Sequence, residues 1–147
     1  MPLVFHPSIK ILLVEDSLSD VLIMQDALAE IRVRGSIHVV DDGVKALAFL
    51  RNQPPYANAL RPDLILLDWN LPRKNGYEVL TEIKSDPILQ TIPVVVLTTS
   101  QAAEDVAKAY KLHANCYVVK PLEFGTFVHA IQSIQHFWLD VVTLPLE

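Results

Sequence analysis

Five short apolar runs, separated by segments of helical periodicity, constrain the fold of this 147-residue chain more than any other feature. The runs cover residues 11–14, 37–40, 64–67, 94–97 and 117–119. Strands with one face in water alternate apolar and polar residues, whereas strands covered on both faces read as continuous apolar runs. The pattern therefore predicts parallel strands buried between helices.

The segments between the runs carry apolar residues at helical spacing. In the first segment, Val21, Met24, Leu28 and Ile31 follow one another at intervals of 3, 4 and 3 residues, which places them on one helical stripe. Further helices are predicted over residues 43–51, from Gly76 to about Asp86, over 101–112 and after Pro121. Strand followed by helix, five times over, predicts an α/β domain with right-handed crossovers and helices on both faces of one parallel sheet.

Composition and charge exclude several classes of protein. Mean hydropathy is +0.30, yet no apolar run approaches the roughly 20 residues of a membrane-spanning helix. Twelve Lys and Arg against 17 Asp and Glu give a net charge of −5, which argues against a nucleic-acid partner. The first residues do not have the pattern of a secretory signal, and the single cysteine, Cys116, suits a reducing compartment. We expect a cytoplasmic protein without a membrane or nucleic-acid partner.

The length suits one domain. We expect an N-terminal extension over residues 1–8, the domain over 9–136 and an apolar tail over 137–147. The tail either folds back on the sheet of its own chain or packs against another chain. Because an exposed apolar patch usually marks an interface, we favour a homodimer built from the last helix, the fourth helix and the tail.

Polar side chains follow four of the five predicted strands. Glu15 and Asp16 follow the first strand, Asp68 the third and Lys120 the fifth, and Thr98 ends the fourth. Ligands of such sheets bind beyond the carboxyl ends of the strands, so we expect these side chains to converge there. Three clustered carboxylates repel one another and call for a cation. Oxygen ligands with few protein groups suit Mg²⁺.

This set of groups fits phosphoryl transfer to a carboxylate. Such a transfer needs an aligned nucleophile and positive charge on the phosphoryl oxygens. An aspartate can serve as the nucleophile and form an acyl phosphate. Asp68 is the candidate because it follows the central strand, between the acid pair and the side of Thr98 and Lys120.

The ordered motifs resemble the receiver domain of two-component response regulators. The resemblance rests on residues 11–16, 62–72, 76, 95–98 and 117–121 and covers about residues 9–135. It implies a flavodoxin-like, doubly wound sheet of five parallel strands in the order 2-1-3-4-5, with five helices. It also implies that a histidine kinase donates a phosphoryl group to Asp68. The protein would then not be an enzyme acting on a metabolite, although it catalyses the loss of its own phosphoryl group.

The resemblance implies a ligand set for Mg²⁺. Asp16, Asp68 and the backbone carbonyl of Asn70 would hold the ion, with Glu15 acting through water.

The resemblance also implies roles for the phosphoryl-binding and switch residues. Thr98 and Lys120 would bind the phosphoryl group, and Tyr117 would turn inward when Thr98 moves toward that group. The peptide bond between Lys120 and Pro121 is expected to be cis.

A narrower resemblance is to the small stand-alone regulators of cyanobacterial phytochromes, the Rcp type. It rests on residues 68–80, 83–87 and 115–117 and on the expectation that no output domain is present. It implies a phytochrome as the kinase, and a homodimer. Trp69 and Thr99 depart from the general receiver pattern and affect access to Asp68, so the lifetime of the phosphoryl group stays open.

Two alternative functions use the same residues. A Mg²⁺-dependent phosphatase of the haloacid dehalogenase kind also forms an aspartyl phosphate. Enzymes of that family, however, carry the motif Asp-x-Asp at the end of the first strand. Here Asp68, Trp69 and Asn70 follow the third strand and lack the second acid. The other alternative is an interaction module whose pocket no longer works.

Overall fold

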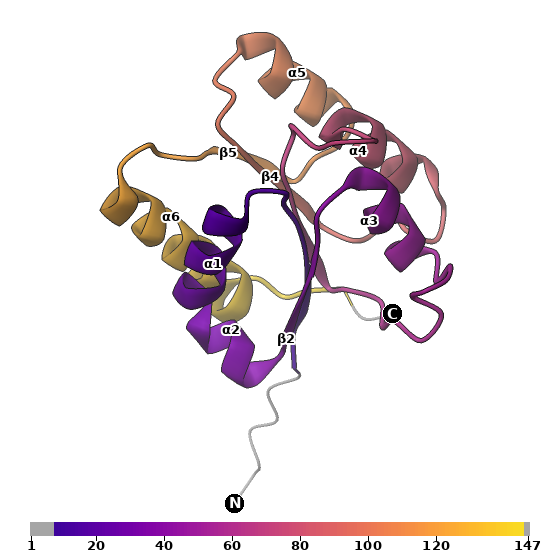
Figure 1. Ribbon diagram of the computed structural model, residues 1–147, viewed down its shortest axis with the longest axis horizontal. Coiled ribbons are helices and arrows are strands. Elements are labelled where there is room, and N and C mark those ends of the chain that lie inside the picture. The colour runs from indigo at the N-terminus through magenta and orange to yellow at the C-terminus, as the bar shows by residue number, and fades with distance from the viewer. Residues whose placement is uncertain (1–7, 146–147) are drawn as a thin grey trace, which may run out of the picture.

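Five parallel strands form the centre of the structure in the spatial order β2-β1-β3-β4-β5 (Figure 1). The computed structural model describes residues 8–145. The strands are β1 (Lys10–Val14), β2 (Ser36–Val40), β3 (Leu64–Leu67), β4 (Val94–Thr98) and β5 (Cys116–Val119). Strand order and parallel pairing confirm the predicted flavodoxin-like fold.

Six α-helices and one π-helical turn flank the sheet within residues 8–145, where the sequence predicts five helices. They are α1 (Leu18–Ala27), α2 (Ala29–Arg34), α3 (Gly43–Leu50), α4 (Gly76–Ser85), α5 (Ala103–Lys111), α6 (Phe124–His136) and η1 (Phe137–Val141). The first predicted helix is interrupted at Leu28, whose ψ of 32° ends α1. Its apolar stripe nevertheless stays buried on both sides of the break, because burial fixes the stripe and not the continuity of the helix.

Two apolar cores lie on opposite faces of the sheet. The helices α3, α4 and α5 cover one face, and α1, α2 and α6 cover the other (Figure 1). Alternate residues of β3 point into opposite cores. Ile65 and Leu67 belong to the core on the α3 and α4 face, and Leu64 and Leu66 belong to the core on the α1 and α6 face. Burial of each such side chain stabilises the fold by about 1.5–3 kcal/mol relative to exposure. The continuous apolar run of β3 thus follows from helices on both sides.

The segment after α6 packs on its own chain. Trp138 in η1 is only 7% exposed and belongs to the core on the α1 and α6 face, and Leu139, Val142 and Leu144 pack against that core. Val141 stays 60% exposed. Of the two possibilities for the tail, the structure supports packing on the same chain for these four side chains, and it leaves Val141 in solvent.

The predicted N-terminal extension lies outside the described residues except for Ser8. Among the helices that the structure describes, none combines the length and the apolar character needed to cross a bilayer.

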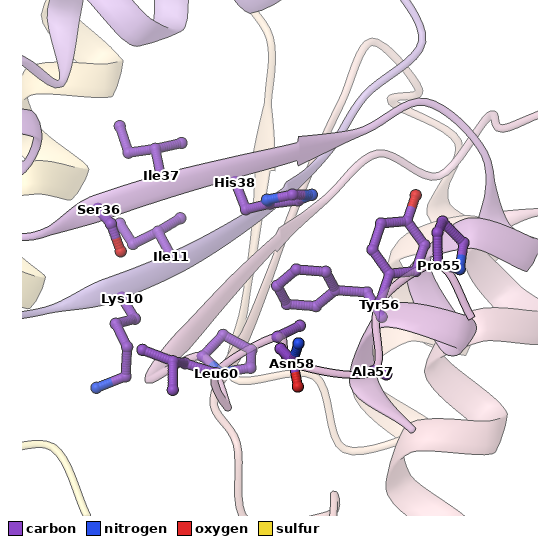
Figure 2. A pocket seen from close by; sticks show the side chains of 13 residues that line it. Lys10, Ile11, Ser36, Ile37, His38, Pro55, Tyr56, Ala57, Asn58 and Leu60 are labelled. Atoms are coloured by element: carbon purple, nitrogen blue, oxygen red, sulfur yellow. The ribbon is translucent and has the colours of Figure 1, made fainter. Parts of the chain in front are cut away.

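A pocket of about 390 Å³ opens at the β2 edge of the sheet (Figure 2). His38, Phe49 and Tyr56 form an aromatic cluster in its wall, with ring centroids 4.5–5.9 Å apart. Burial lowers the pKa of His38. Lys10 and Ser36, the first residues of β1 and β2, also line the pocket. It therefore lies toward the amino ends of these strands, away from the predicted site.

Candidate functional site

The carboxyl ends of the strands bring the predicted acidic residues together. The β1–β3 register pairs Val14 with Leu67, so the residues that follow these two strands are neighbours. Carboxylate oxygens of Glu15, Asp16 and Asp68 lie within 4.8 Å of one another. Glu15 and Asp68 are buried and Asp16 is exposed. The predicted acidic cluster therefore exists, open to solvent on the Asp16 side.

Backbone hydrogen bonds fix the position of each strand end. The N–H of Glu15 donates to the carbonyl oxygen of Val40 at 3.0 Å, and the N–H of Asp68 donates to that of Val14 at 3.0 Å. On the other side, the N–H of Lys120 donates to the carbonyl oxygen of Thr98 at 2.7 Å. The hydrogen-bond ladder of the sheet thus continues one residue past β1, β3 and β5, and its last donors are the predicted site residues Glu15, Asp68 and Lys120.

The start of α4 packs directly against the backbone at Asp68. A Cβ atom at Gly76 would lie 2.6 Å from the carbonyl oxygen of Asp68, a distance that real Cβ atoms essentially never show. Asn75 caps the helix in a reciprocal capping box with Glu78. The lack of a side chain at residue 76 therefore permits α4 to begin beside Asp68.

Asp68 is 8% exposed, and both of its carboxylate oxygens accept hydrogen bonds. Oδ1 accepts from the N–H of Asn70 at 3.2 Å, and Oδ2 accepts from Nζ of Lys120 at 3.5 Å. Thr98 is fully buried and reaches this network through Asn70, whose Nδ2 donates to Thr98 Oγ1 at 3.4 Å. Asn70 thus links Asp68 to Thr98.

Lys120 is surrounded by three carboxylates. Its Nζ donates to Glu15 Oε1 in a short contact, to Asp20 Oδ2 at 3.0 Å and to Asp68 Oδ2 at 3.5 Å. Burial disfavours the ammonium, but the hydrogen bond to Glu15 and the charges of Asp68 and Glu15 outweigh it and raise the pKa of Lys120. The lysine therefore carries a buried positive charge beside Asp68.

Sequence reasoning missed Asp20 as a site residue. In the sequence it is an acid in the first turn of a helix, a position that favours acids through the helix dipole alone. The signal that could have found it is spacing, since Asp20 lies one helical turn after the acid pair, on a helix that starts beside the cluster.

Glu15 has an unusually high affinity for protons. Its burial raises the pKa, the hydrogen bond from Lys120 lowers it, and the charge of Asp68 raises it again, so that the pKa of Glu15 reaches about 7. Oε1 accepts from Lys120, and Oε2 accepts from the N–H of Ser17 at 3.2 Å. The carboxylate therefore shares one ammonium with two other acids.

Tyr117 lies beside the segment that follows Thr98. Its hydroxyl donates to the carbonyl oxygen of Ser100 at 3.0 Å, and its ring packs edge-on against Trp69 with centroids 6.4 Å apart. Burial raises the pKa of Tyr117, as do the charges of Asp105 and Asp68. The structure thus places the predicted switch tyrosine half-buried, next to Trp69, the residue that follows Asp68.

The expected cis bond between Lys120 and Pro121 is wrong. Among the described residues the cis peptide bond is that between Pro54 and Pro55. A bond preceding proline favours trans by only about 0.5–1 kcal/mol, so the dipeptide alone does not determine the isomer.

The acidic cluster fits a hard divalent cation. Its three side chains offer only oxygen ligands, which suit Mg²⁺ or Mn²⁺ and not a thiolate-preferring metal. The carbonyl oxygen of Asn70 is the fourth predicted ligand, and the N–H of the same residue already donates to Asp68.

Comparison with known proteins decides the family. Residues 11–132 match the response regulator receiver domain. This chain belongs to that family. It is 48% identical over 140 residues to the response regulator Rcp1 of Synechocystis sp. (strain ATCC 27184 / PCC 6803 / Kazusa), which covers 95% of each chain.

Two solved structures resemble this receiver domain over nearly its whole length. The Mn²⁺-bound form of Rcp1 has a TM-score of 0.90 and 48% identity, covering 93% of this chain and 99% of the other. The phosphorylated cyanobacterial phytochrome response regulator RcpA has a TM-score of 0.90 and 50% identity, covering 93% and 98%. The predicted kinship with Rcp-type regulators is confirmed, and a relative with this fold binds a divalent metal.

The raised pKa of Glu15 predicts how stability depends on pH in metal-free protein. Between about pH 4.5, the ordinary value, and about pH 7, the folded receiver holds a proton on Glu15 that the unfolded chain has lost. The Glu15 contribution to the free energy of unfolding therefore falls as pH rises through this window and is constant above it. Urea denaturation with a chelator, on wild type and Glu15→Gln, measures that contribution as their difference.

Glu104→Gln, an exposed acid in the first turn of α5, is the control and should follow wild type. If the free energies of unfolding of wild type and Glu15→Gln changed in parallel between pH 4.5 and 7, the raised pKa of Glu15 would be contradicted.

Proposed function

We propose that this receiver domain accepts a phosphoryl group on Asp68 from a histidine kinase and signals through the resulting change in its protein contacts. The observation that carries the proposal is the position of Asp68 between an all-oxygen cluster suited to a divalent cation and the buried ammonium of Lys120. Negative charge on a transferring phosphoryl group is thus met by positive charge from two sides.

The proposed transfer conserves atoms and charge. An oxygen of Asp68 attacks the phosphorus of a phosphorylated imidazole, the new O–P bond forms as the P–N bond breaks, and the imidazole nitrogen keeps the electron pair of that bond. Water later attacks the acyl phosphate, releases inorganic phosphate and restores the carboxylate. This self-catalysed loss is the only turnover that the proposal includes.

Each neighbouring residue has a defined task in this proposal. Asp16, Asp68 and the carbonyl of Asn70 would hold Mg²⁺, with Glu15 acting through water. Bound Mg²⁺ supplies positive charge to the phosphoryl oxygens. Thr98 and Lys120 donate hydrogen bonds to the remaining oxygens.

A hydrogen-bonded path supports Thr98 and Tyr117 as the switch pair. The N–H of Ser100 donates to Thr98 Oγ1 at 3.4 Å, and the carbonyl of Ser100 accepts from the Tyr117 hydroxyl. Phosphorylation adds about −1.5 to −2 charges. When Thr98 turns toward this charge it releases Ser100, and the segment leading into α5 and the Tyr117 ring shift together.

Kinship with phytochrome response regulators supports a phytochrome as the kinase. Because such a kinase draws its phosphoryl group from ATP, the proposal places this protein in the cytoplasm. The alternative phosphatase function finds less support, since the residue two positions after Asp68 is Asn70 and not an acid.

Substitution of the acceptor tests the proposed function. Wild-type protein incubated with Mg²⁺ and acetyl phosphate, or with a phosphorylated phytochrome kinase, should gain one phosphoryl group by mass spectrometry. Asp68→Asn should gain none, because an amide does not form the acyl phosphate. The control is Asp86→Asn, which removes a carboxylate remote from the cluster and should be labelled like wild type.

Undiminished labelling of Asp68→Asn would refute the proposal that Asp68 accepts the phosphoryl group. Steady turnover of small phosphomonoesters would support the phosphatase alternative. An unlabelled wild type would support the interaction module.

We also propose a homodimer that uses α5, α6 and the tail. The edge strand β5 is half-buried along its whole length, whereas β4 is buried throughout. Tyr110, Phe137 and Val141 present large exposed side chains on α5 and η1. A second copy would cover this surface.

A charged residue in the tail tests the dimer. Val141→Lys should shift the mass measured by light scattering from dimer toward monomer at micromolar concentration, because an ammonium would be buried at the interface. Val33→Lys, at an 86% exposed position on α2, is the matched control and should stay dimeric. A wild type that is monomeric across the concentration range would remove the proposal.

A further inference from the structure

Of the three described carboxylates that contact Lys120, Asp20 is the one outside the acidic cluster. The cluster of possible cation ligands contains Glu15, Asp16 and Asp68. Asp20 instead contacts the ammonium from α1, at 3.0 Å, and its side chain is 27% exposed. Its backbone N–H donates to Ser17 Oγ at 3.3 Å in the helix cap, which fixes where the side chain starts.

Each of the three hydrogens of the Lys120 ammonium has a carboxylate acceptor. A lysine has three donors, and here the acceptors are Glu15, Asp20 and Asp68. The distance from Nζ to Asp68, 3.5 Å, is longer than the distance to Asp20, 3.0 Å. Glu15 and Asp68 also belong to the cation cluster, so a bound cation would compete with Lys120 for these two acids and not for Asp20.

We propose that Asp20 is a positioning residue that holds the Lys120 ammonium over Asp68 while Glu15 turns to the divalent cation. The inference rests on the proposed function and names a residue that controls retention of the phosphoryl group. Without Asp20, a lysine that loses Glu15 has only Asp68 to hold it, and the ammonium is free to move toward solvent.

The negative charge of Asp20 also repels a phosphoryl group, so the two effects must be compared. The ion pair of Asp20 with Lys120 is a direct contact at 3.0 Å, whereas a phosphoryl group would extend from Asp68, a carboxylate that itself lies 3.5 Å from the ammonium. Water reaches Asp20 and screens the longer interaction more than the direct one. We therefore expect positioning to outweigh repulsion.

Binding of beryllofluoride, an analogue of the acyl phosphate, tests the inference when it is measured in the presence of Mg²⁺. Fluorescence of Trp69, which follows the acceptor, reports binding. Asp20→Ala should bind beryllofluoride about tenfold more weakly than wild type, the effect of losing one charge-assisted hydrogen bond. Its affinity for Mg²⁺ alone should stay within about twofold, because Asp20 lies outside the cation cluster.

Two further variants make the result specific. Asp26→Ala removes an exposed acid of the same helix whose side chain makes no hydrogen bond or ion pair with the described residues, and it should match wild type for both ligands. Asp20→Asn keeps an acceptor of the same shape and should lie between wild type and Asp20→Ala. If the alanine variant does not fold, the asparagine variant alone must still lose beryllofluoride affinity with Mg²⁺ affinity unchanged.

Several results would overturn the inference. Equal or tighter beryllofluoride binding by Asp20→Ala would do so, and so would an equal loss of Mg²⁺ affinity or the same loss in Asp26→Ala. Failure of wild type to bind beryllofluoride with Mg²⁺ would instead refute the proposed function, so the two failures are distinguishable.

Discussion

A single buried ammonium organises the functional edge of this receiver domain. Lys120, from the end of β5, contacts acids that follow β1 and β3 and an acid in the first turn of α1. Transfer of a charge from water into the protein is costly unless it is paired and hydrogen-bonded, so the lysine and the acids depend on one another. The same grouping leaves excess negative charge, which suits a divalent cation.

The sheet fixes the positions of these charges. Ladder hydrogen bonds run through Glu15, Asp68 and Lys120, and the absence of a side chain at Gly76 lets α4 begin against Asp68. From Asp68, contacts continue through Asn70 and Thr98 to Ser100 and Tyr117. A change of charge at one strand end thus has a short physical path to α5.

Much of the fold and of the site could be predicted from the sequence, for reasons that also explain the exceptions. Unbroken apolar runs identify strands covered on both faces, and parallel strands bring their ends together, so Glu15, Asp68 and Lys120 were predictable neighbours. Asp20 was not predicted as part of the site: its spacing places it one helical turn after the acid pair, but its contact with Lys120 depends on how α1 is oriented relative to the residue that follows β5. The interruption at Leu28 and the packing of Trp138 on its own core also depend on tertiary contacts.

A crystal structure of the protein with Mg²⁺ and beryllofluoride tests the central claim most directly. We expect the beryllium to be bonded to an oxygen of Asp68, with Nζ of Lys120 in contact with both a fluorine and Asp20. Beryllofluoride on another residue, or an ammonium that points away from the fluorines, would contradict it.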